Sequence, residues 1–399
     1  MITSAPSTDI LIVGGGMVGG VLAHALVQAG WRVTVLEGAA PGESPSFDAR
    51  LTALSEASWR YLDALGLVDA STAAHAQAIE EVRVVDAGHF GMTRITRANN
   101  HGVALGEVIA NRQIEQALIQ ARRALPPGAL DWRQPARYLG HALAADGQSV
   151  CVRFLQDGIE QQQSTRLLVA ADGAHSPVRA QTGATVQHQP YGQTAIVCTA
   201  RPERPHQGTG FECFTRGGPL AVLPAPAGRV SLVWVNRDED IPALMALSDE
   251  AYAARLNQLF RARLGRLTEL TARSAYPLNL VTVQELTAPR LVILGNAAHA
   301  LHPVAGQGFN LCLRDVRDLV DSLRADRGVP VDPGAAERLS HYTALRAADY
   351  RRTIGLTDRL VKGFSLDLPG AGLLRGALLS ALDGVRPIKN RLVRLTRGI

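Results

Sequence analysis

Residues 9–19 read Asp-Ile-Leu-Ile-Val-Gly-Gly-Gly-Met-Val-Gly, and this stretch decides the fold. The apolar run over residues 9–13 predicts a short buried strand, and the pattern over residues 17–29 predicts a helix that Gly30 ends. A second apolar strand is predicted over residues 32–36. A strand, a helix and another strand in this order form a βαβ unit, which implies a parallel sheet in an α/β protein.

The glycines between the first strand and the helix fit the pattern G-x-G-x-x-G at Gly14, Gly16 and Gly19. The first glycine allows a tight turn, the second lets the backbone approach a pyrophosphate, and the third allows close packing of helix on sheet. Glu37 ends the second strand, where a carboxylate can accept both hydroxyls of an adenosine ribose. These residues predict a dinucleotide-binding site. A tight turn with an incidental glutamate is the alternative.

Two further segments follow predicted strands and end in turns. Residues 170–179 read Ala-Ala-Asp-Gly-Ala-His-Ser-Pro-Val-Arg, and residues 295–310 read Gly-Asn-Ala-Ala-His-Ala-Leu-His-Pro-Val-Ala-Gly-Gln-Gly-Phe-Asn. Between them, residues 181–280 change to strand-like alternation, and the chain after about Asp315 has a helical pattern. The pattern indicates a nucleotide domain built from separated segments, a β-rich insertion and a helical C-terminus.

Together, the three segments resemble those of the flavoprotein aromatic monooxygenases with the p-hydroxybenzoate hydroxylase fold. They occur in that family's order and at similar spacing. Within the family, residues 48–55 and residues 302–311 most resemble the ubiquinone-biosynthesis hydroxylases. The start Gly-Asn-Ala-Ala at residue 295 resembles the 2-octaprenyl-6-methoxyphenol hydroxylase branch.

The resemblance implies an α/β fold in which a Rossmann-like FAD-binding domain carries a β-rich substrate domain and a helical C-terminus. The FAD-binding domain is expected to be discontinuous, over residues 1–75, 100–180 and 281–340. The substrate domain is expected over residues 76–99 and 181–280, and the C-terminal helices over residues 341–399.

The resemblance also implies roles for individual residues around FAD. The ADP part is expected to lie on the glycine turn and Glu37, with Arg50 near the flavin and Arg112 in contact with FAD. Asp172 is expected close to the pyrophosphate and to the nicotinamide cofactor. Backbone contacts to the pyrophosphate, the ribityl chain or the ring are expected from Gly306, Gln307, Gly308 and Asn310.

The candidate catalytic residues lie in the third segment. The resemblance puts Pro303 at the reactive edge of the flavin, and His302 is our candidate for the base that accepts the phenolic proton. His299 and His302 do not predict a metal site, because no carboxylate or cysteine ligand is near them in the sequence.

Asn296 is the one departure from the family pattern. The wider family usually has aspartate there, to hold the ribityl hydroxyls. Asparagine still accepts a hydrogen bond through its carbonyl oxygen, but it brings no negative charge. We expect FAD binding to survive at reduced affinity, and a non-catalytic copy of the enzyme is the alternative.

The activity that the resemblance implies is FAD-dependent monooxygenation. NADH or NADPH would reduce FAD, and a C4a-hydroperoxyflavin would transfer oxygen to a polyprenylated phenol in ubiquinone biosynthesis. The protein would supply position and electrostatics while the flavin carries the oxygen chemistry. A hydroxylase of a soluble aromatic metabolite and a non-catalytic FAD-binding assembly subunit are the alternatives.

The net charge of +5 lies entirely in the last 25 residues, which hold six basic residues and one acid. A neutral body argues against a nucleic-acid-binding surface. The apolar and basic tail predicts an amphipathic surface that docks on an anionic membrane or on proteins of the ubiquinone pathway. A helix packed on the body with solvated arginines is the alternative.

The four scattered cysteines and the lack of a signal peptide or long apolar run predict a reduced, cytoplasmic setting, peripheral on the inner membrane face.

Overall fold

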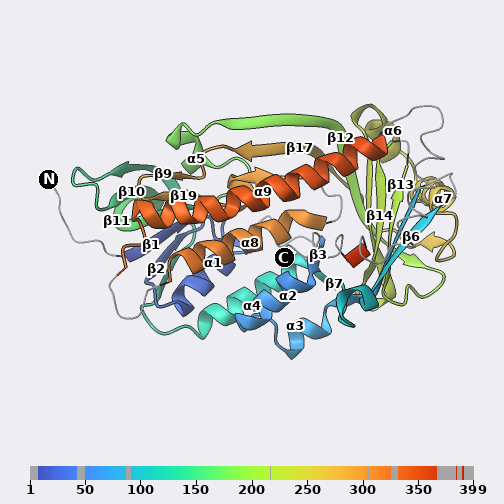
Figure 1. Ribbon diagram of the computed structural model, residues 1–399, viewed down its shortest axis with the longest axis horizontal. Coiled ribbons are helices and arrows are strands. Elements are labelled where there is room, and N and C mark those ends of the chain that lie inside the picture. Colours follow the sequence, from blue (N-terminus) through green and yellow to red (C-terminus); the bar gives the residue numbers. More distant parts are fainter. Residues whose placement is uncertain are drawn as a thin grey trace.

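The computed structural model describes residues 8–42, 50–86, 91–215, 217–302, 306–324, 331–365, 383, 389 and 390. Over residues 356–365 only the backbone is described. A parallel sheet with its helices lies at one end of the elongated molecule, and a second large sheet lies at the other (Figure 1).

The first sheet contains the predicted βαβ unit. Its described strands run in the order β18 (Thr287–Ala288), β19 (Leu291–Ile293), β11 (Ile159–Ala170), β1 (Thr8–Val13), β2 (Val33–Leu36) and β8 (Leu130–Arg133). The strands from β19 to β8 are parallel. The antiparallel strands β9 (Ala136–Leu143) and β10 (Val150–Gln156) extend β11.

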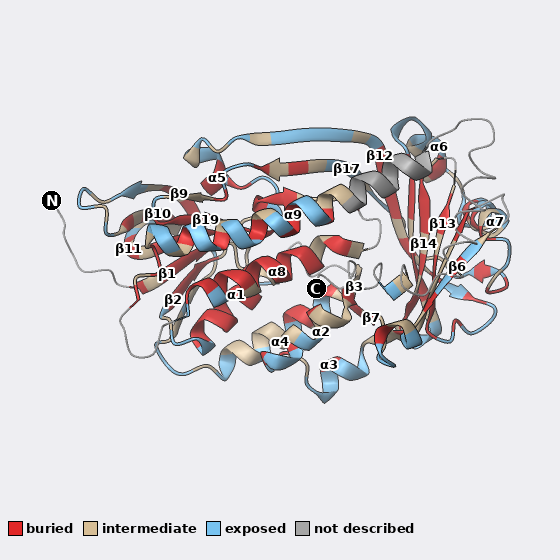
Figure 2. Ribbon diagram, viewed as in Figure 1, coloured by how far each residue is buried: buried red, intermediate tan, exposed pale blue. Residues whose placement is uncertain are grey.

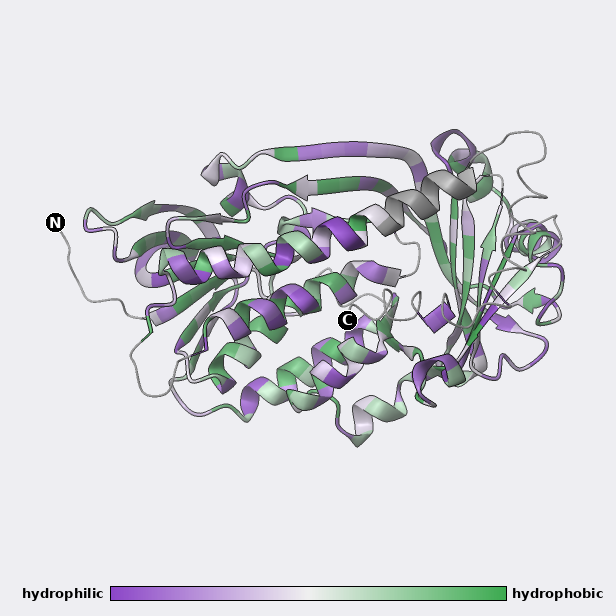
Figure 3. Ribbon diagram, in the orientation of Figure 1, coloured by the Kyte–Doolittle hydropathy of each residue, from purple (hydrophilic) through white to green (hydrophobic). Residues whose placement is uncertain are grey.

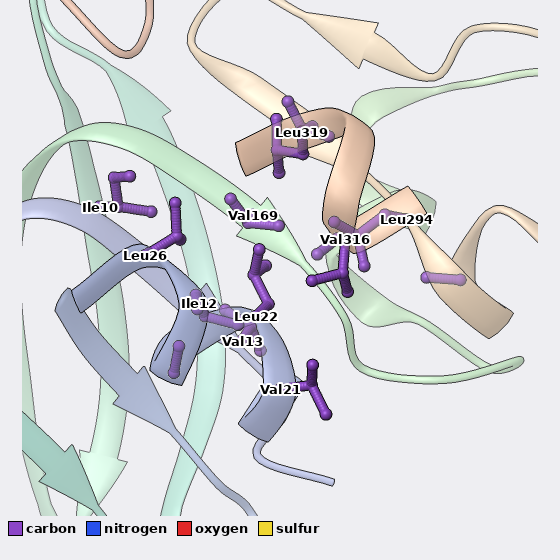
Figure 4. Packing of buried hydrophobic residues seen from close by; sticks show 14 of the residues in the cluster. Ile10, Ile12, Val13, Val21, Leu22, Leu26, Val169, Leu294, Val316 and Leu319 are labelled. Carbon is purple, nitrogen blue, oxygen red and sulfur yellow. The ribbon is translucent and has the colours of Figure 1, made fainter. Parts of the chain in front are cut away.

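Helices cover this sheet, which explains why β1 is a continuous apolar run rather than an alternating one. α1 (Met17–Gln28) contacts both α4 (Asn111–Arg123) and α8 (Gln307–Ser322). Figure 4 shows side chains of β1, α1, β11 and α8 converging, among them Leu22, Val169 and Val316. This core fixes the loops at the carboxyl ends of β1 and β11.

The second sheet is antiparallel for most of its width. Its described strands run in the order β20 (His299–Ala300), β17 (Ser274–Val283), β12 (Val186–Pro202), β15 (Arg229–Arg237), β14 (Pro219–Ala225), β13 (Thr209–Phe214), β5 (Glu81–Asp86) and β6 (Met92–Thr96). The short β16 (Leu267–Thr268) pairs with β12. Hydrophobic residues run along the central strands (Figure 3).

A second hydrophobic core lies between this sheet and the helices α6 (Ile241–Met245) and α7 (Asp249–Phe260). Its buried members come from residue 85 and from residues 196–267, all within the segments expected to form the substrate domain. Figure 2 shows the central strands largely buried and α7 partly exposed. This part of the chain therefore has a core of its own.

A small sheet lies between the two large ones. It consists of β3 (Leu51–Ser55), β7 (Gly106–Ala110) and β4 (Gln77–Ile79). The helices α2 (Glu56–Ala64) and α3 (Ala70–Ala74) follow β3, and α5 (Pro177–Thr182) follows β11. β4 and β7 both contact β14, so the small sheet joins the two halves of the molecule.

The C-terminal helix α9 (Ala336–Ser365) packs on α8, and its Tyr342 and Tyr350 belong to the first core. The expected boundary between residues 340 and 341 falls inside α9, so the first half of this helix is part of the FAD-binding body. Sequence patterns place helices better than they place domain boundaries, because the packing partners of a helix are distant in sequence. None of the described helices has the length and apolar character needed to cross a bilayer.

Candidate functional site

The glycine turn after β1 is closed by the loop after β11. Gly14 has a φ angle of +101°, and a Cβ atom there would collide with the carbonyl oxygen of Ala171. A Cβ atom at Gly19 would collide with the carbonyl oxygen of Gly14. Gly16 is the N-cap of α1, which has no side-chain cap and no acid in its first turn. The turn therefore leaves backbone N–H groups at a helix N-terminus for an anion.

Glu37 lies beside the glycine turn, as expected. Its Oε2 accepts a hydrogen bond from the Gly15 N–H at 2.6 Å, and its Oε1 accepts one from the Ala39 N–H at 2.7 Å. Each carboxylate oxygen can accept a further bond, so the group can still receive two ribose hydroxyls.

A pocket of about 270 Å³ opens beside this turn and is lined by Gly15, Gly16 and Glu37 among others. The ring of Trp132 would lie 2.6 Å from a Cβ atom at Gly15, and the Arg122 guanidinium lies 4.2 Å from the centroid of that ring. Trp132 and Arg122 were not predicted from the sequence. Only their place in the fold connects these two residues with the site. Trp132 lies on the strand that neighbours β2, and Arg122 lies in the last turn of α4.

Asp172 follows β11 and faces the same turn. Its Oδ2 accepts a hydrogen bond from the Val178 N–H at 3.2 Å, while its buried Oδ1 has no hydrogen-bond partner among the described residues. Burial raises the pKa of this carboxyl. A carboxyl with an unused, buried oxygen beside a helix N-terminus is suited to bind a hydroxyl or amide of a ligand.

The N-terminus of α8 is the second helix start of the site. Gly306 is its N-cap, with a φ angle of +60°, and the helix has no side-chain cap and no acid in its first turn. Asn310 Nδ2 donates to the carbonyl oxygens of Ala53 (2.9 Å) and Gly306 (2.6 Å), and its Oδ1 accepts from the Ser55 N–H (2.8 Å). Asn310 thus ties the helix start to β3, and Gln307 and Gly308 form the first turn of that helix.

Asn296 lies in a 3-10 turn over Gly295–Ala297. Its side chain is exposed, and the Cys312 thiol lies 3.6 Å from its Oδ1. A Cβ atom at Gly295 would lie 3.0 Å from Val18 in α1, so this turn and the glycine turn are held against each other.

His299 and His302 contact different residues. His299 Nε2 lies 2.7 Å from the Asp315 carboxylate, with both side chains buried. His302 Nε2 lies 3.3 Å from Gln193 Oε1, and the ring packs edge-on against Tyr191 with centroids 5.0 Å apart. The two histidines therefore do not converge on one metal ion.

The contacts of Gln193 assign the tautomer of His302. Gln193 Nε2 donates to the Gly217 carbonyl oxygen at 3.0 Å, so the Oε1 that faces His302 is an acceptor and His302 Nε2 must donate. Burial lowers the pKa of His302 to about 4, and the residue has no accessible surface. His302 is thus a neutral, enclosed group, whereas Pro303 lies outside the described residues.

The two predicted arginines differ in setting. The Arg50 guanidinium lies 5.1 Å from the ring centroid of Tyr276, and so bridges the first half of the molecule to the second sheet. Arg112 is exposed in the first turn of α4, and no contact with another described residue identifies a role for it.

The site has the features that a dinucleotide cofactor requires. The turn at Gly14 and Gly19 has no room for a side chain, the N-termini of α1 and α8 are open, and Glu37 and Asp172 supply acceptors nearby. These residues fit FAD, whose pyrophosphate would be held by the helix N-termini and whose adenosine ribose would be held by Glu37.

Comparison with known proteins agrees with this fit. The FAD binding domain family matches residues 7–354. Ubiquinone hydroxylase UbiL of Rhodospirillum rubrum is 38% identical over 392 residues, covering 98% of this chain and 89% of the relative. The 3-demethoxyubiquinol 3-hydroxylase of Escherichia coli is 32% identical over 397 residues, covering 98% of this chain and 99% of the relative. The chain belongs to the FAD-dependent hydroxylase family of ubiquinone biosynthesis.

Solved structures of flavoprotein monooxygenases have the same fold as this chain. The crystal structure of p-nitrophenol 4-monooxygenase PnpA from Pseudomonas putida matches with a TM-score of 0.79 at 18% identity, covering 97% of this chain and 96% of that one. The prediction of an FAD-dependent monooxygenase with the p-hydroxybenzoate hydroxylase fold is confirmed. In this hydroxylase, the roles of the individual site residues and the resemblance to the 2-octaprenyl-6-methoxyphenol branch stay predictions.

Proposed function

We propose that the protein hydroxylates a polyprenylated phenol in ubiquinone biosynthesis, with FAD as cofactor and NADH or NADPH as electron donor. The observation that carries the proposal is the closed glycine turn at Gly14, Gly16 and Gly19 with Glu37 and Asp172, in a chain whose other half is a nine-stranded sheet. When bound, FAD supplies the activation of dioxygen.

The residues of this chain would do the rest. The N-termini of α1 and α8 would hold the cofactor phosphates, and Asn310 would keep the start of α8 against β3. The described part of the second sheet would form the wall of the substrate site and exclude water from it. The buried His302 would close one end of that wall through Gln193.

The test is made on the full chain reconstituted with FAD. Oxidation of NADH and of NADPH is followed with and without a short-chain 2-prenylphenol, and the products are identified by mass spectrometry under ¹⁸O₂. We expect a product that has gained one labelled oxygen atom. We also expect one of the two nicotinamide cofactors to be oxidised faster when the phenol is present.

Two results would count against it. A protein that binds FAD but never oxidises either nicotinamide cofactor would favour the non-catalytic assembly subunit. Hydroxylation of phenol itself with the same efficiency as of 2-prenylphenol would favour a hydroxylase of soluble aromatic metabolites.

We also propose that the C-terminal tail docks the enzyme on an anionic membrane surface, where a polyprenylated substrate resides. The support is the composition of residues 373–395, which hold seven leucines together with four arginines and one lysine. Lys389 is the one basic residue of the tail that the structure describes, and it contacts the body. Its Nζ lies 3.3 Å from the carbonyl oxygen of Arg94 on β6 and 3.0 Å from Asp383. The arginines of the tail lie outside the described residues.

A further inference from the structure

The nine-stranded sheet has two different faces. Phe211, Leu232 and Trp234 point to the face that packs under α6 and α7. Successive residues of a strand point to opposite faces, so the residues between them point away from these helices. Tyr276 lies on that other face, because it pairs with Ala195 in the ladder, next to the core residue Ile196.

This other face looks toward the FAD-binding half of the molecule. The Arg50 guanidinium lies over the Tyr276 ring, and β4 and β7 of the small sheet contact β14. Figure 1 shows α7 on one side of the sheet and β3, β7 and α8 on the opposite side.

One row of five residues crosses this face from strand to strand. Glu212 on β13 is aligned with Val84 on β5 and with Ala221 on β14. The row continues through the aligned residues Val233 on β15 and Val197 on β12. All five keep part of their surface accessible, although their strands lie in the middle of the sheet. The row is therefore a partly open, apolar wall with one carboxyl in it.

Glu212 has no structural partner that explains its presence. Its carboxyl makes no hydrogen bond or ion pair with any residue in the described part of the chain. Desolvation by the surrounding protein raises its pKa to about 7. Leaving a carboxyl in an apolar setting without a partner costs stability, which is typical of residues kept for chemistry.

We propose that Glu212 is the catalytic base that accepts the phenolic proton of the substrate during hydroxylation. The inference rests on the proposed function, which supplies the oxidant as dioxygen reduced through FAD by NADH or NADPH. The apolar neighbours Val84, Ala221 and Val233 would lie against the substrate ring, and the carboxyl would face its hydroxyl.

The step that Glu212 performs is a proton transfer. The phenolic O–H bond breaks, the proton moves to a carboxylate oxygen of Glu212, and the electron pair stays on the phenolic oxygen. The ring carbon becomes more nucleophilic toward the transferred oxygen atom. It loses its own hydrogen as a proton when the ring regains aromaticity, and this proton enters the water that the second oxygen atom of dioxygen forms. The carboxylic acid then returns its proton to the phenolic oxygen of the product.

Glu212 suits this step better than His302 does. A base is most effective when its pKa lies near the working pH, which holds for a carboxyl at about 7 and not for an imidazole at about 4. His302 is also fully buried and donates its Nε2–H to Gln193. Three other described carboxyls lie near this wall. Asp86 lies two residues after Val84 on β5, Glu80 follows β4, and Glu107 lies on β7.

The experiment compares the wild-type holoenzyme with Glu212→Gln, Glu212→Asp and the surface control Glu239→Gln. Glu239 lies in the same half of the molecule with a largely exposed side chain. The readouts are FAD affinity, reduction of FAD by the nicotinamide cofactor without substrate, hydroxylation of 2-prenylphenol, and peroxide release, each between pH 5.5 and 9.

We expect Glu212→Gln to bind and reduce FAD like the wild type but to hydroxylate about 100-fold more slowly, with peroxide released instead. Wild-type hydroxylation should rise with pH through about 7, and the variant should lose this rise. Glu212→Asp should retain part of the rate and the rise, and Glu239→Gln should match the wild type.

Two outcomes overturn the assignment. One is a Glu212→Gln variant that keeps the wild-type rate and the rise near pH 7. The other is a variant that loses FAD affinity in proportion to activity, which would make Glu212 a residue of the cofactor site. If the wild type reduces FAD but never hydroxylates 2-prenylphenol, the proposed function fails and the assignment fails with it.

Discussion

Arg346 and Asp315 form an ion pair with 2.8 Å between the guanidinium Nε and the carboxylate Oδ1, and neither side chain is accessible to solvent. The other carboxylate oxygen of Asp315 accepts hydrogen bonds from the Gly295 N–H (3.0 Å) and from His299 (2.7 Å). Burial opposes the ionisation of Asp315, but His299 and Arg346 outweigh it, and the pKa of the carboxyl is lowered. The pair connects α9 through α8 to the turn that starts at Gly295.

Replacing Arg346 by methionine should destabilise the protein by about 3–5 kcal/mol, because the buried carboxylates of Asp315, Asp318 and Asp349 lose the cation they share. The free energy of unfolding in urea measures this. FAD affinity should also fall, since the turn at Gly295 loses its anchor.

The matched control is Arg324→Met, which breaks an exposed ion pair with Asp321. Its effect should stay within about 1 kcal/mol. Equal losses from the two variants would show that the buried network adds nothing beyond a surface pair.

Gly14→Ala should abolish FAD binding, because the new Cβ would collide with the carbonyl oxygen of Ala171 where the glycine turn must close. The flavin content of the purified protein and a fluorescence titration with FAD measure the effect.

Gly30→Ala is the control for backbone strain. Gly30 also has a positive φ angle, +93°, but a Cβ atom there would meet nothing within 4 Å. It should cost about 1–2 kcal/mol of stability and leave FAD bound. If both variants bind FAD normally, the glycine turn is not the cofactor site.

Glu212→Gln should make the protein more stable than the wild type at pH 8 and no different near pH 4. Glutamate in the unfolded chain loses its proton above its ordinary pKa of 4.5, whereas folded Glu212 keeps its proton up to about 7. The free energy of unfolding of the wild type therefore falls as the pH rises from 4.5 to about 7. Glutamine does not ionise, so the variant does not show this fall. The gain should reach about 1–3 kcal/mol above pH 7, measured by urea unfolding at several pH values. A variant less stable than the wild type at pH 8 would mean that the ionised carboxyl has a partner.

Neutralising the basic tail should weaken binding to anionic vesicles while FAD stays bound. Each lysine or arginine near such a surface is worth about 1 kcal/mol at low salt. The variant carries glutamine at Arg386, Lys389, Arg391 and Arg394, and vesicle sedimentation at low salt measures the loss.

The control carries glutamine at four exposed arginines of the body, namely Arg60, Arg153, Arg201 and Arg266. A tail variant that sediments like this control would favour a helix packed on the body, as the contact between Lys389 and the carbonyl oxygen of Arg94 already indicates for one residue.

The locally encoded parts of the structure could be predicted from the sequence. β1 and α1 differ from the bounds expected from the sequence by one residue each. Features that depend on distant partners could not be predicted. β12 runs over Val186–Pro202, and its exposed, polar first half forms a strand because it pairs with β17, which is distant in sequence.

The same reason separates the predicted from the unpredicted site residues. Gly14, Gly16, Gly19 and Glu37 form a local pattern, so their proximity followed from the βαβ unit. The ion pair of Asp315 with Arg346 joins residues that look like ordinary helix surface in the sequence. Glu212 had one usable signal, a single acid between the apolar residues of β13, but only the sheet register shows which face it occupies.

The hydroxylation of a ubiquinone precursor is best tested by deletion of the gene, followed by identification of the quinone precursors that accumulate. We expect loss of ubiquinone and accumulation of a polyprenylated phenol that lacks one ring hydroxyl. Restoration should follow from the wild-type gene and not from the Gly14→Ala variant. Unchanged ubiquinone with no accumulated precursor, in a strain without a second hydroxylase of this family, would contradict the account.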